Sequence, residues 1–294
     1  MAADSARGDA PIGVFDSGLG GLTVVRALLR QLPAERFVYL GDTARVPYGT
    51  RSAATVCRYA ESCASVLTSH HMKALVVACG TVSAVALEPL RSALTVPVLG
   101  VVEPGAQAAV QAALKLASGS GGKVKIGVLG TEGTIRSRAY ERAVASLSSD
   151  VELVTQAAPL FVPLAEEGWV SGEVPRLAAL RYVEPLIRAG ASVLVLACTH
   201  YPLLAPVIRE VAEELAGRPV TIVDSAEASA TALAALLEER GIAAQRPLTP
   251  RLKLLATDLP ASFHTSACRF LGAEAPEVTQ VDITDTESHR PSVF

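Results

Sequence analysis

Two short motifs occur twice in this chain, in the same order and at nearly the same spacing. IGVFDSG at 12–18 returns as IGVLGTE at 126–132, 114 residues later, and LVVACGT at 75–81 returns as LVLACTH at 194–200, with 119 residues between the cysteines. Convergence of short apolar strands is the alternative explanation, and the shared order argues against it. The motif pairs therefore predict an internal duplication, with two similar halves related by a pseudo-twofold axis. The segment SGSGG at 118–122 is expected to be a flexible break between the repeats.

Apolar segments of strand length alternate with Ala- and Leu-rich helical segments along the chain. The predicted strands are 12–16, 37–41, 74–78, 96–101, 125–130, 151–156, 193–197, 219–224, 252–256 and 278–283. The predicted helices include 21–31, 52–70, 84–93, 104–117, 135–147, 174–189, 202–216 and 226–240. This alternation is typical of parallel sheets covered by helices on both faces. We predict an α/β fold of two pseudo-symmetric parallel-sheet domains, with the active site in the cleft between them.

The length of 294 residues suits two domains of about 130–150 residues each. We expect a discontinuous first domain, formed by 11–103 together with 219–294, and a second domain formed by 104–218.

Composition excludes several classes of protein. Half of the residues are apolar and 19% are charged, so a sizeable core forms and global disorder is excluded. The net charge of −3 and the lack of a basic stripe with aromatic residues argue against nucleic acid as a partner. No apolar run is long enough for a membrane span, and the first ten residues do not resemble a signal peptide. A cytoplasmic location is therefore expected.

The five cysteines are an odd number at irregular spacing, with no CxxC pair and no Cys/His metal cluster. Cys57, Cys63 and Cys268 lie on predicted helices and are assigned to packing. Cys79 and Cys198 instead follow the carboxyl ends of two equivalent strands, where ligands bind in open α/β sheets. Each precedes a predicted helix, whose N-terminus favours an anion, so we expect the pKa of both thiols to be lowered.

Two thiols from pseudo-symmetric halves suit a reaction that removes a proton from one face of a stereocentre and returns one to the other. Hydrolysis by a Cys/His pair needs only one thiol. Pyridoxal phosphate requires an active-site lysine. None of the five lysines lies at the carboxyl end of a strand: Lys73, Lys115, Lys123, Lys125 and Lys253. The residues therefore predict racemisation by two thiols without a cofactor or a metal.

Five motifs in register resemble the glutamate racemases of the aspartate/glutamate racemase superfamily. They are DSGLGGLTV at 16–24, GDTARVPYG at 41–49, ACGTVSA at 78–84, FVPLAEEG at 161–168 and LACTHYPLL at 196–204. The likeness continues through LLATDLPASFHTSACRFLG at 254–272 and covers the chain from Pro11 to about Ile283. It implies interconversion of L- and D-glutamate, the supply of D-glutamate for peptidoglycan, and a homodimer.

The resemblance also implies a role for individual residues. Cys79 resembles the acid/base on the D-glutamate side, assisted by Asp16, and Cys198 resembles the one on the L-glutamate side, assisted by Glu166 and His200. Glu167 is expected to be a solvated neighbour. Residues matching substrate-binding positions of the family are Asp16, Ser17, Tyr48, Gly49, Gly80, Thr81, Thr134, Thr199 and His200.

One position departs from the family pattern. The family usually has Cys-Asn-Thr at the first thiol, whereas this chain has Cys79-Gly80-Thr81. We expect a water or a nearby hydroxyl, from Thr81 or Ser83, to replace the missing amide. If the backbone is ordinary at Gly80, a Gly80→Asn substitution should lower the KM for glutamate.

Simpler interpretations exist for several of these residues. Asp16-Ser17 could be only a helix cap, GLGG at 18–21 lacks the spacing of a dinucleotide loop, and His200 alone could be a structural histidine. His70-His71 lies at a predicted helix end and is given no catalytic role. Alternative functions are a racemase of the same superfamily that acts on aspartate or a related acid, and a two-lobed amino-acid-binding protein.

Overall fold

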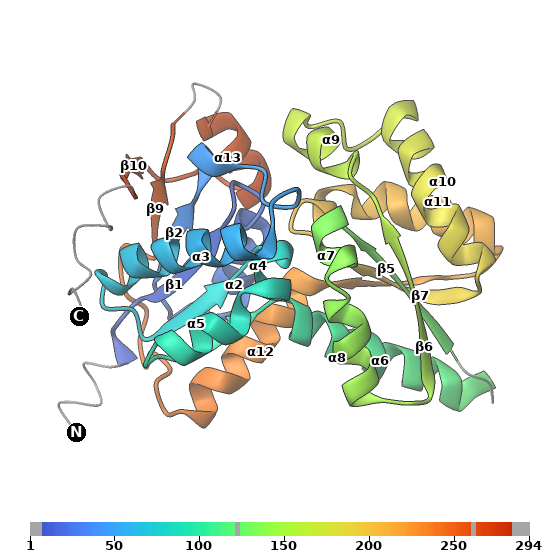
Figure 1. Ribbon diagram of the computed structural model, residues 1–294, viewed down its shortest axis with the longest axis horizontal. Coiled ribbons are helices and arrows are strands. Elements are labelled where there is room, and N and C mark those ends of the chain that lie inside the picture. The colour runs from blue at the N-terminus through green and yellow to red at the C-terminus, as the bar shows by residue number, and fades with distance from the viewer. Residues whose placement is uncertain (1–7, 121–123, 260–262, 284–294) are drawn as a thin grey trace.

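The computed structural model describes residues 8–120, 124–259 and 263–283. Two lobes lie side by side, and each is built on its own parallel sheet (Figure 1). The predicted fold class of two parallel-sheet α/β domains is confirmed.

The first sheet has the strand order β10-β9-β2-β1-β3-β4. Its strands are β1 (Ile12–Asp16), β2 (Phe37–Gly41), β3 (Ala74–Val77), β4 (Val98–Gly100), β9 (Leu252–Ala256) and β10 (Val278–Gln280). Every residue of β1, β2 and β3 is buried, because helices cover both faces of the sheet. Alternate residues serve opposite faces, so Val14 joins one hydrophobic cluster and Phe15 the other.

The second sheet has the order β6-β5-β7-β8 and is also parallel. Its strands are β5 (Val124–Gly130), β6 (Val151–Ala157), β7 (Ala191–Leu196) and β8 (Thr221–Asp224). This order repeats β2-β1-β3-β4 of the first sheet strand for strand. The internal duplication predicted from the two motif pairs is thus present in the topology.

The strand at 221–224 corrects one predicted domain boundary. The sequence analysis placed residues from 219 onward in the first domain, but β8 pairs with β7 in the second sheet. The duplication explains this placement, because β8 is the counterpart of β4. The chain returns to the first half only after Asp224. The other predicted boundary, between 103 and 104, falls near the start of helix α6, and residues 284–294 lie outside the described part of the chain.

Helices cover the sheets and also join the two halves. They are α2 (Leu22–Gln31), α3 (Ala53–Thr68), α4 (Gly80–Val85), α5 (Leu87–Ala93), α6 (Val102–Ser120), α7 (Glu132–Arg136), α8 (Ala139–Leu147), α9 (Phe161–Glu167), α10 (Glu173–Arg188), α11 (Ala205–Ala216), α12 (Ser225–Glu239) and α13 (Phe263–Leu271), with 3-10 turns η1 (Thr43–Arg45) and η2 (Tyr201–Leu204). α12 packs against α2 and β4 of the first half and against α6 and β8 of the second. One hydrophobic cluster consequently extends through both halves.

Two predicted helices and the predicted break between the repeats differ in detail from the structure. The segment predicted as 84–93 begins earlier and is divided into α4 and α5 at Ala86, which is not helical. The segment 135–147 is divided at Arg138, which has a φ of 56°. Of the predicted break at 118–122, residues up to Ser120 continue α6, and 121–122 lie outside the described residues.

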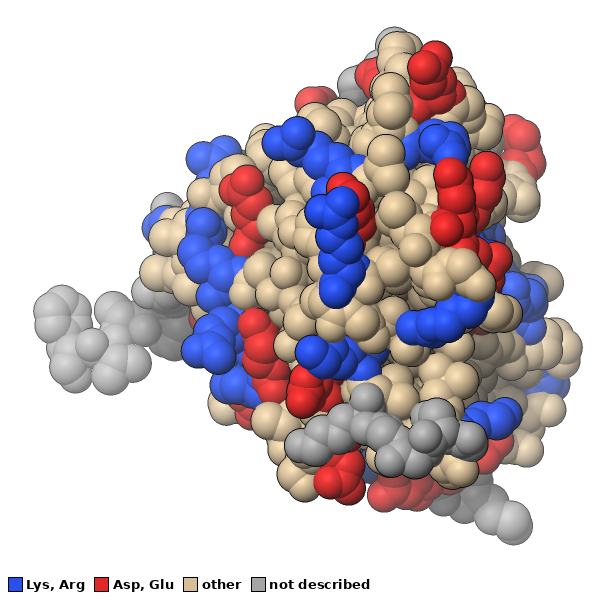
Figure 2. All heavy atoms as spheres, turned by 90° about the vertical axis from the view of Figure 1, so that its right-hand side faces the viewer, with Lys and Arg blue, Asp and Glu red and all other residues tan. Residues whose placement is uncertain are grey.

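The surface of the second half carries charges of both signs. Figure 2 shows Lys and Arg interspersed with Asp and Glu on the face that it presents, without a continuous basic stripe. Ion pairs of this half include Arg176–Glu214 and Arg188–Glu184. None of the helices in the described ranges combines the length and hydropathy needed to cross a membrane.

Candidate active site

The carboxyl ends of the strands in the two sheets face a common cavity of about 360 Å³. Cys79 follows β3 and caps α4, and Cys198 occupies the equivalent position after β7. Each thiol residue is 6% exposed. Eleven of the twelve predicted site residues line the cavity: Ser17, Tyr48, Gly49, Cys79, Gly80, Thr81, Thr134, Glu166, Cys198, Thr199 and His200. The twelfth, Asp16, is not in the cavity wall and is almost completely buried at the end of β1.

Cys79 lies beside a hydroxyl and near a buried carboxylate. Its Sγ is 3.4 Å from Ser17 Oγ, and Asp16 Oδ2 accepts the Gly18 N–H at 3.0 Å. Burial raises the pKa of the Cys79 thiol to about 12, and the negative charge of Asp16 adds to this effect. The lowered pKa expected for this thiol is therefore wrong for the substrate-free protein. Desolvation outweighs the favourable end of α4, a helix of only six residues.

Cys198 is the first member of a chain of three polar groups. Its Sγ is 3.8 Å from His200 Nδ1, and His200 Nε2 is 3.1 Å from Glu166 Oε1. Burial alone would lower the pKa of His200, but the hydrogen bonds with Cys198 and Glu166 and the charges of Cys198 and Asp16 raise this pKa to about 10. His200 therefore places a positive charge beside the Cys198 sulfur.

Of the two adjacent acids at the end of α9, the structure places one in the cavity. Glu166 lines it and contacts His200, whereas Glu167 is exposed and does not line it. This placement agrees with the register that the sequence motif favoured.

Three threonine hydroxyls form a connected group in the wall of the cavity. Thr131 Oγ1 lies 3.1 Å from Thr81 Oγ1 and 3.0 Å from Thr134 Oγ1, so the three hydroxyls connect the two halves. Sequence reasoning did not single out Thr131. The duplication could have found it, because Thr131 stands 114 residues after Ser17, in the same place of the repeated motif. The side chain of Thr131 also caps α7 by accepting the Thr134 N–H at 3.3 Å.

Hydrogen bonds to the buried Asp42 carboxylate stabilise the loop that carries Tyr48 and Gly49. This carboxylate is fully buried and accepts hydrogen bonds from the Tyr48 hydroxyl, from Arg45 Nε at 2.6 Å and from Thr257 Oγ1 at 2.9 Å. The Tyr48 hydroxyl is thus engaged with Asp42. What the loop offers to a ligand is the tyrosine ring and the backbone.

Gly80 lies against the backbone of the other half. It is the first residue of α4 and does not have a positive φ. A Cβ atom built there would be 2.7 Å from the carbonyl oxygen of Ala197, the residue before Cys198. A side chain at position 80 therefore requires the backbone at Gly80 or at Ala197 to shift.

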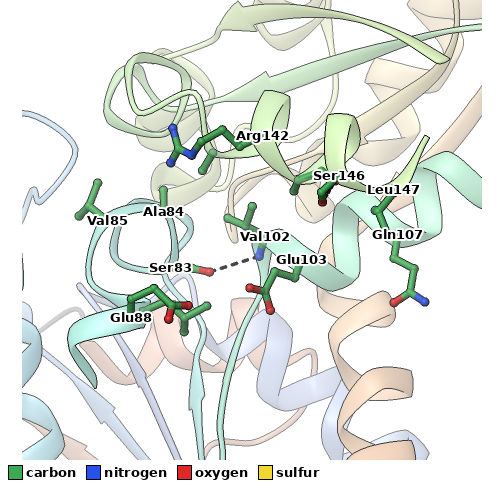
Figure 3. Close-up of a pocket in the computed structure, with 13 residues that line it drawn as sticks. Ser83, Ala84, Val85, Glu88, Val102, Glu103, Gln107, Arg142, Ser146 and Leu147 are labelled. Carbon is green, nitrogen blue, oxygen red and sulfur yellow. Dashed lines mark hydrogen bonds between the residues drawn. The ribbon is translucent and has the colours of Figure 1, made fainter. Parts of the chain in front are cut away.

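Ser83 does not replace the missing amide at position 80. It lines a second cavity, of about 720 Å³, between α4–α5 and α6–α8 (Figure 3). Its Oγ accepts the backbone N–H of Val102 at 3.2 Å, as the dashed line shows. Thr81 is the one of the two proposed hydroxyls that lines the cavity of the thiols, and neither Cys79 nor Cys198 lines the second cavity.

The remaining cysteines lie away from the thiol pair. Cys63 is fully buried in the core under α3, and burial raises its pKa to about 12. Cys57 and Cys268 are half-buried and pack at the edges of hydrophobic clusters. Lys73 pairs with Glu35 at 2.6 Å, outside the site, and no lysine of the described ranges lines the cavity.

The sequence matches the Asp/Glu/Hydantoin racemase family over residues 12–233. It is 49% identical to a glutamate racemase of Geobacter metallireducens, covering 92% of this chain and 96% of the relative. Identity to a glutamate racemase of Chlorobaculum tepidum is 44%, covering 93% and 96% of the two chains. The structure superimposes on that of a Francisella tularensis glutamate racemase in complex with D-glutamate with a TM-score of 0.82, at 32% identity and covering 94% of this chain and 99% of the other.

Proposed function

The chain belongs to the Asp/Glu/Hydantoin racemase family, and we propose that it interconverts L- and D-glutamate with Cys79 and Cys198 as the two proton carriers. The observation that carries this proposal is the position of the thiols. One comes from each of two equivalent strand ends, and both line one cavity.

In the direction from L- to D-glutamate, the Cys198 thiolate removes the proton from Cα, and the Cys79 thiol gives its proton to the opposite face. The electron pair of the broken C–H bond stays on Cα and forms the new bond. Cys198 ends as a thiol and Cys79 as a thiolate, and exchange with water restores the starting state. The reverse reaction exchanges the two roles. Neither step uses an electron sink or a metal ion.

The electrostatics of the free site support this division of roles. His200, whose pKa is raised to about 10, is an imidazolium at neutral pH and lies 3.8 Å from the sulfur of Cys198, which would be the base in this direction. Burial raises the pKa of Cys79 to about 12, with the charge of Asp16 adding to the effect, so Cys79 is a neutral thiol that can donate a proton. The ammonium group of a bound amino acid would offset the charge of Asp16 and lower the barrier to ionising Cys79 in the reverse reaction.

We further propose that the groups around the thiols hold the substrate. The hydroxyls of Ser17, Thr81, Thr134 and Thr199, together with backbone groups of Tyr48, Gly49 and Gly80 and the side chain of His200, would bind its ammonium and carboxylate groups. Asp16, which lies behind the cavity wall, would attract the ammonium group through its charge. Thr131 would act with Thr81 and Thr134, since the three hydroxyls are in contact.

The experiment is a polarimetric assay of the chelator-treated protein with D-glutamate and D-aspartate in parallel, without added pyridoxal phosphate. We expect activity with glutamate and loss of more than tenfold in both Cys79→Ala and Cys198→Ala, a barrier increase above about 1.4 kcal/mol. Each substitution removes the proton carrier for one face. A preference for aspartate would contradict the substrate assignment. A single thiol variant retaining more than a tenth of the activity would contradict the pairing.

Three biological expectations accompany this function. We propose that the protein supplies D-glutamate for peptidoglycan, acts in the cytoplasm and forms a homodimer, as the resemblance to the glutamate racemases implies. Size-exclusion chromatography with light scattering tests the dimer. Depletion of the protein should arrest growth unless D-glutamate is supplied in the medium.

A further inference from the structure

We propose that the outward face of α13 binds a zinc-like divalent cation through His264, Cys268 and Glu274. Three ligand atoms of different chemistry meet here: an imidazole nitrogen, a thiol sulfur and a carboxylate oxygen. The cluster lies outside the cavity of Cys79 and Cys198.

The helix and the turn after it bring these three side chains together. His264 and Cys268 are one helical turn apart on α13, beside the face formed by its buried residues, Phe263, Ala267, Phe270 and Leu271. Gly272, with a φ of 71°, ends the helix and lets the chain fold back over this face. Ala275 then donates its backbone N–H to Cys268 Sγ at 3.4 Å, and Glu274 comes beside His264.

The distances between the donor atoms are close to those of a tetrahedral zinc site. His264 Nε2 is 3.4 Å from Glu274 Oε1 and 4.0 Å from Cys268 Sγ, and all three donors lie within 4.8 Å of one another. Zinc bonds of about 2.3 Å to sulfur and about 2.0 Å to nitrogen and oxygen place N and O about 3.3 Å apart, and N and S about 3.5 Å apart. His264 and Glu274 are exposed, so rotation of their side chains, with loss of the contact of 3.3 Å between His264 Nε2 and the Ala275 carbonyl oxygen, would bring the atoms to that spacing.

The donor set selects the class of cation. A thiolate with an imidazole and one carboxylate suits Zn²⁺ or Co²⁺, whereas Mg²⁺ and Ca²⁺ prefer sites made of oxygen. The Cys268 thiol releases its proton to solvent as the metal–sulfur bond forms. Thiolate and carboxylate together balance the two charges of the ion. The Ala275 N–H directed at the sulfur stabilises the thiolate, and a water molecule completes the four ligands.

The inner side of the same helix touches the candidate active site. Phe270 lies edge-on to the His200 ring, with 5.1 Å between centroids, and Arg269 donates a hydrogen bond to the backbone carbonyl of Glu166. A cation on the outer side would tie α13 to the turn at 272–275 and so stabilise the support of His200 and Glu166.

The test uses the full chain with Cys79→Ser and Cys198→Ser, because the two cavity thiols could also bind soft metals. Co²⁺ is titrated while the thiolate-to-cobalt absorption band is followed, and Zn²⁺ is then measured by competition with a chelating dye. We expect one ion per chain. Cys268→Ser should abolish the absorption band, and His264→Gln and Glu274→Gln should each weaken Zn²⁺ binding at least tenfold. Cys57→Ser, at a half-buried cysteine outside the cluster, is the matched control and should bind as the parent does.

A second readout is thermal unfolding. Zn²⁺ should raise the Tm of the parent and of the Cys57→Ser control, and should leave that of Cys268→Ser unchanged. Absence of saturable binding, or binding that survives the loss of Cys268 or His264, would overturn the proposal. His264 and Glu274 are exposed, so their variants keep the test decisive if Cys268→Ser folds poorly. Racemisation is not measured, and the outcome is independent of the proposed function.

Discussion

The two thiols differ in the charge that surrounds each of them. Cys79 lies near the buried carboxylate of Asp16, whereas Cys198 lies beside His200, which is held by Glu166. The two halves are similar in fold, but the groups that surround their thiols differ. A negative group therefore lies near one thiol and a positive group beside the other before substrate enters.

The charge of His200 predicts a pH-dependent stability. Its folded pKa of about 10 exceeds the unfolded value of about 6.5, so the stabilisation is fully present below pH ~6.5 and is lost as the pH rises through about 10. Urea unfolding of the substrate-free protein from pH 6 to 9 should show the free energy of unfolding falling by up to about 1.4 kcal/mol per pH unit. His200→Gln should lack this slope. The raised pKa values of Cys79 and Cys63 are common to both proteins and cancel in the comparison. Parallel curves for the two proteins would show that His200 is not charged in the fold.

Substitution of Gly80 should cause a steric clash, whereas the sequence alone led us to expect that Gly80→Asn increases the affinity for glutamate. The backbone is ordinary, yet an added Cβ would meet the Ala197 carbonyl oxygen at 2.7 Å. Forcing this contact costs about 1–3 kcal/mol, which corresponds to a loss of about 5- to 150-fold in kcat/KM for Gly80→Ala. Gly80→Asn should lose at least as much and should not lower KM.

Gly49→Ala is the comparison for Gly80, because it also adds a methyl group to the cavity wall but meets its nearest neighbour, Thr131, at 3.6 Å. It should lose less activity than Gly80→Ala. A lower KM in Gly80→Asn would instead mean that the backbone shifts easily and that the amide contacts substrate.

At the scale of elements, the loop after β2 is organised around one buried carboxylate. Asp42 accepts from Arg45, Tyr48 and Thr257, and the Arg45 guanidinium lies 4.2 Å from the centre of the Tyr59 ring. The cavity wall formed by Tyr48 and Gly49 therefore depends on a charge that does not touch the cavity.

Asp42→Asn should lower stability and weaken substrate binding together. It leaves Arg45 without its carboxylate, and loss of one partner of a buried pair costs about 3–5 kcal/mol. Because Arg45 is about a quarter exposed, we expect the lower part of this range. KM for glutamate should rise more than kcat falls, since the thiols are not touched. Tyr48→Phe, which loses one hydrogen bond to the same carboxylate, should show a smaller change of the same sign. Unchanged KM in Asp42→Asn would separate the loop from substrate binding.

The predicted strands agree with the structure within a few residues, because buried parallel strands have a continuous apolar pattern that few other elements share. Helix limits agree less well. The divisions at Ala86 and Arg138 are turns of the backbone, and the helical periodicity on either side does not record them.

At the scale of the whole molecule, each half contributes one thiol to one side of the cavity, and this predicts an isotopic asymmetry. In deuterium oxide, newly formed D-glutamate should carry solvent deuterium at Cα, while the remaining L-glutamate stays largely protiated early in the reaction. The reason is that each thiol addresses a single face of the substrate. Mass spectrometry of the separated enantiomers measures both. Equal deuterium in product and residual substrate at early times would indicate a single base serving both faces.

The sequence by itself determined the class of fold, the duplication and the two thiol positions. These are local properties: apolar continuity defines strands, and a repeated motif marks equivalent strand ends whatever the intervening chain does. The tertiary structure decided the rest. In the structure β8 pairs within the second sheet, and Ser83 lines a different cavity from the thiols. Thr131 contacts Thr81 in the cavity wall, and Gly80 packs against the backbone of Ala197.

The pKa of the Cys79 thiol and the grouping of His264, Cys268 and Glu274 also depend on the tertiary structure. Proximity to a helix N-terminus can be inferred from sequence and predicts a lowered thiol pKa, but burial depends on everything that packs around the group. At Cys79 desolvation is the larger effect, and the pKa rises to about 12. Likewise, His264, Cys268 and Glu274 show no metal-binding spacing in the sequence, and Glu274 reaches the other two only because the chain folds back after Gly272.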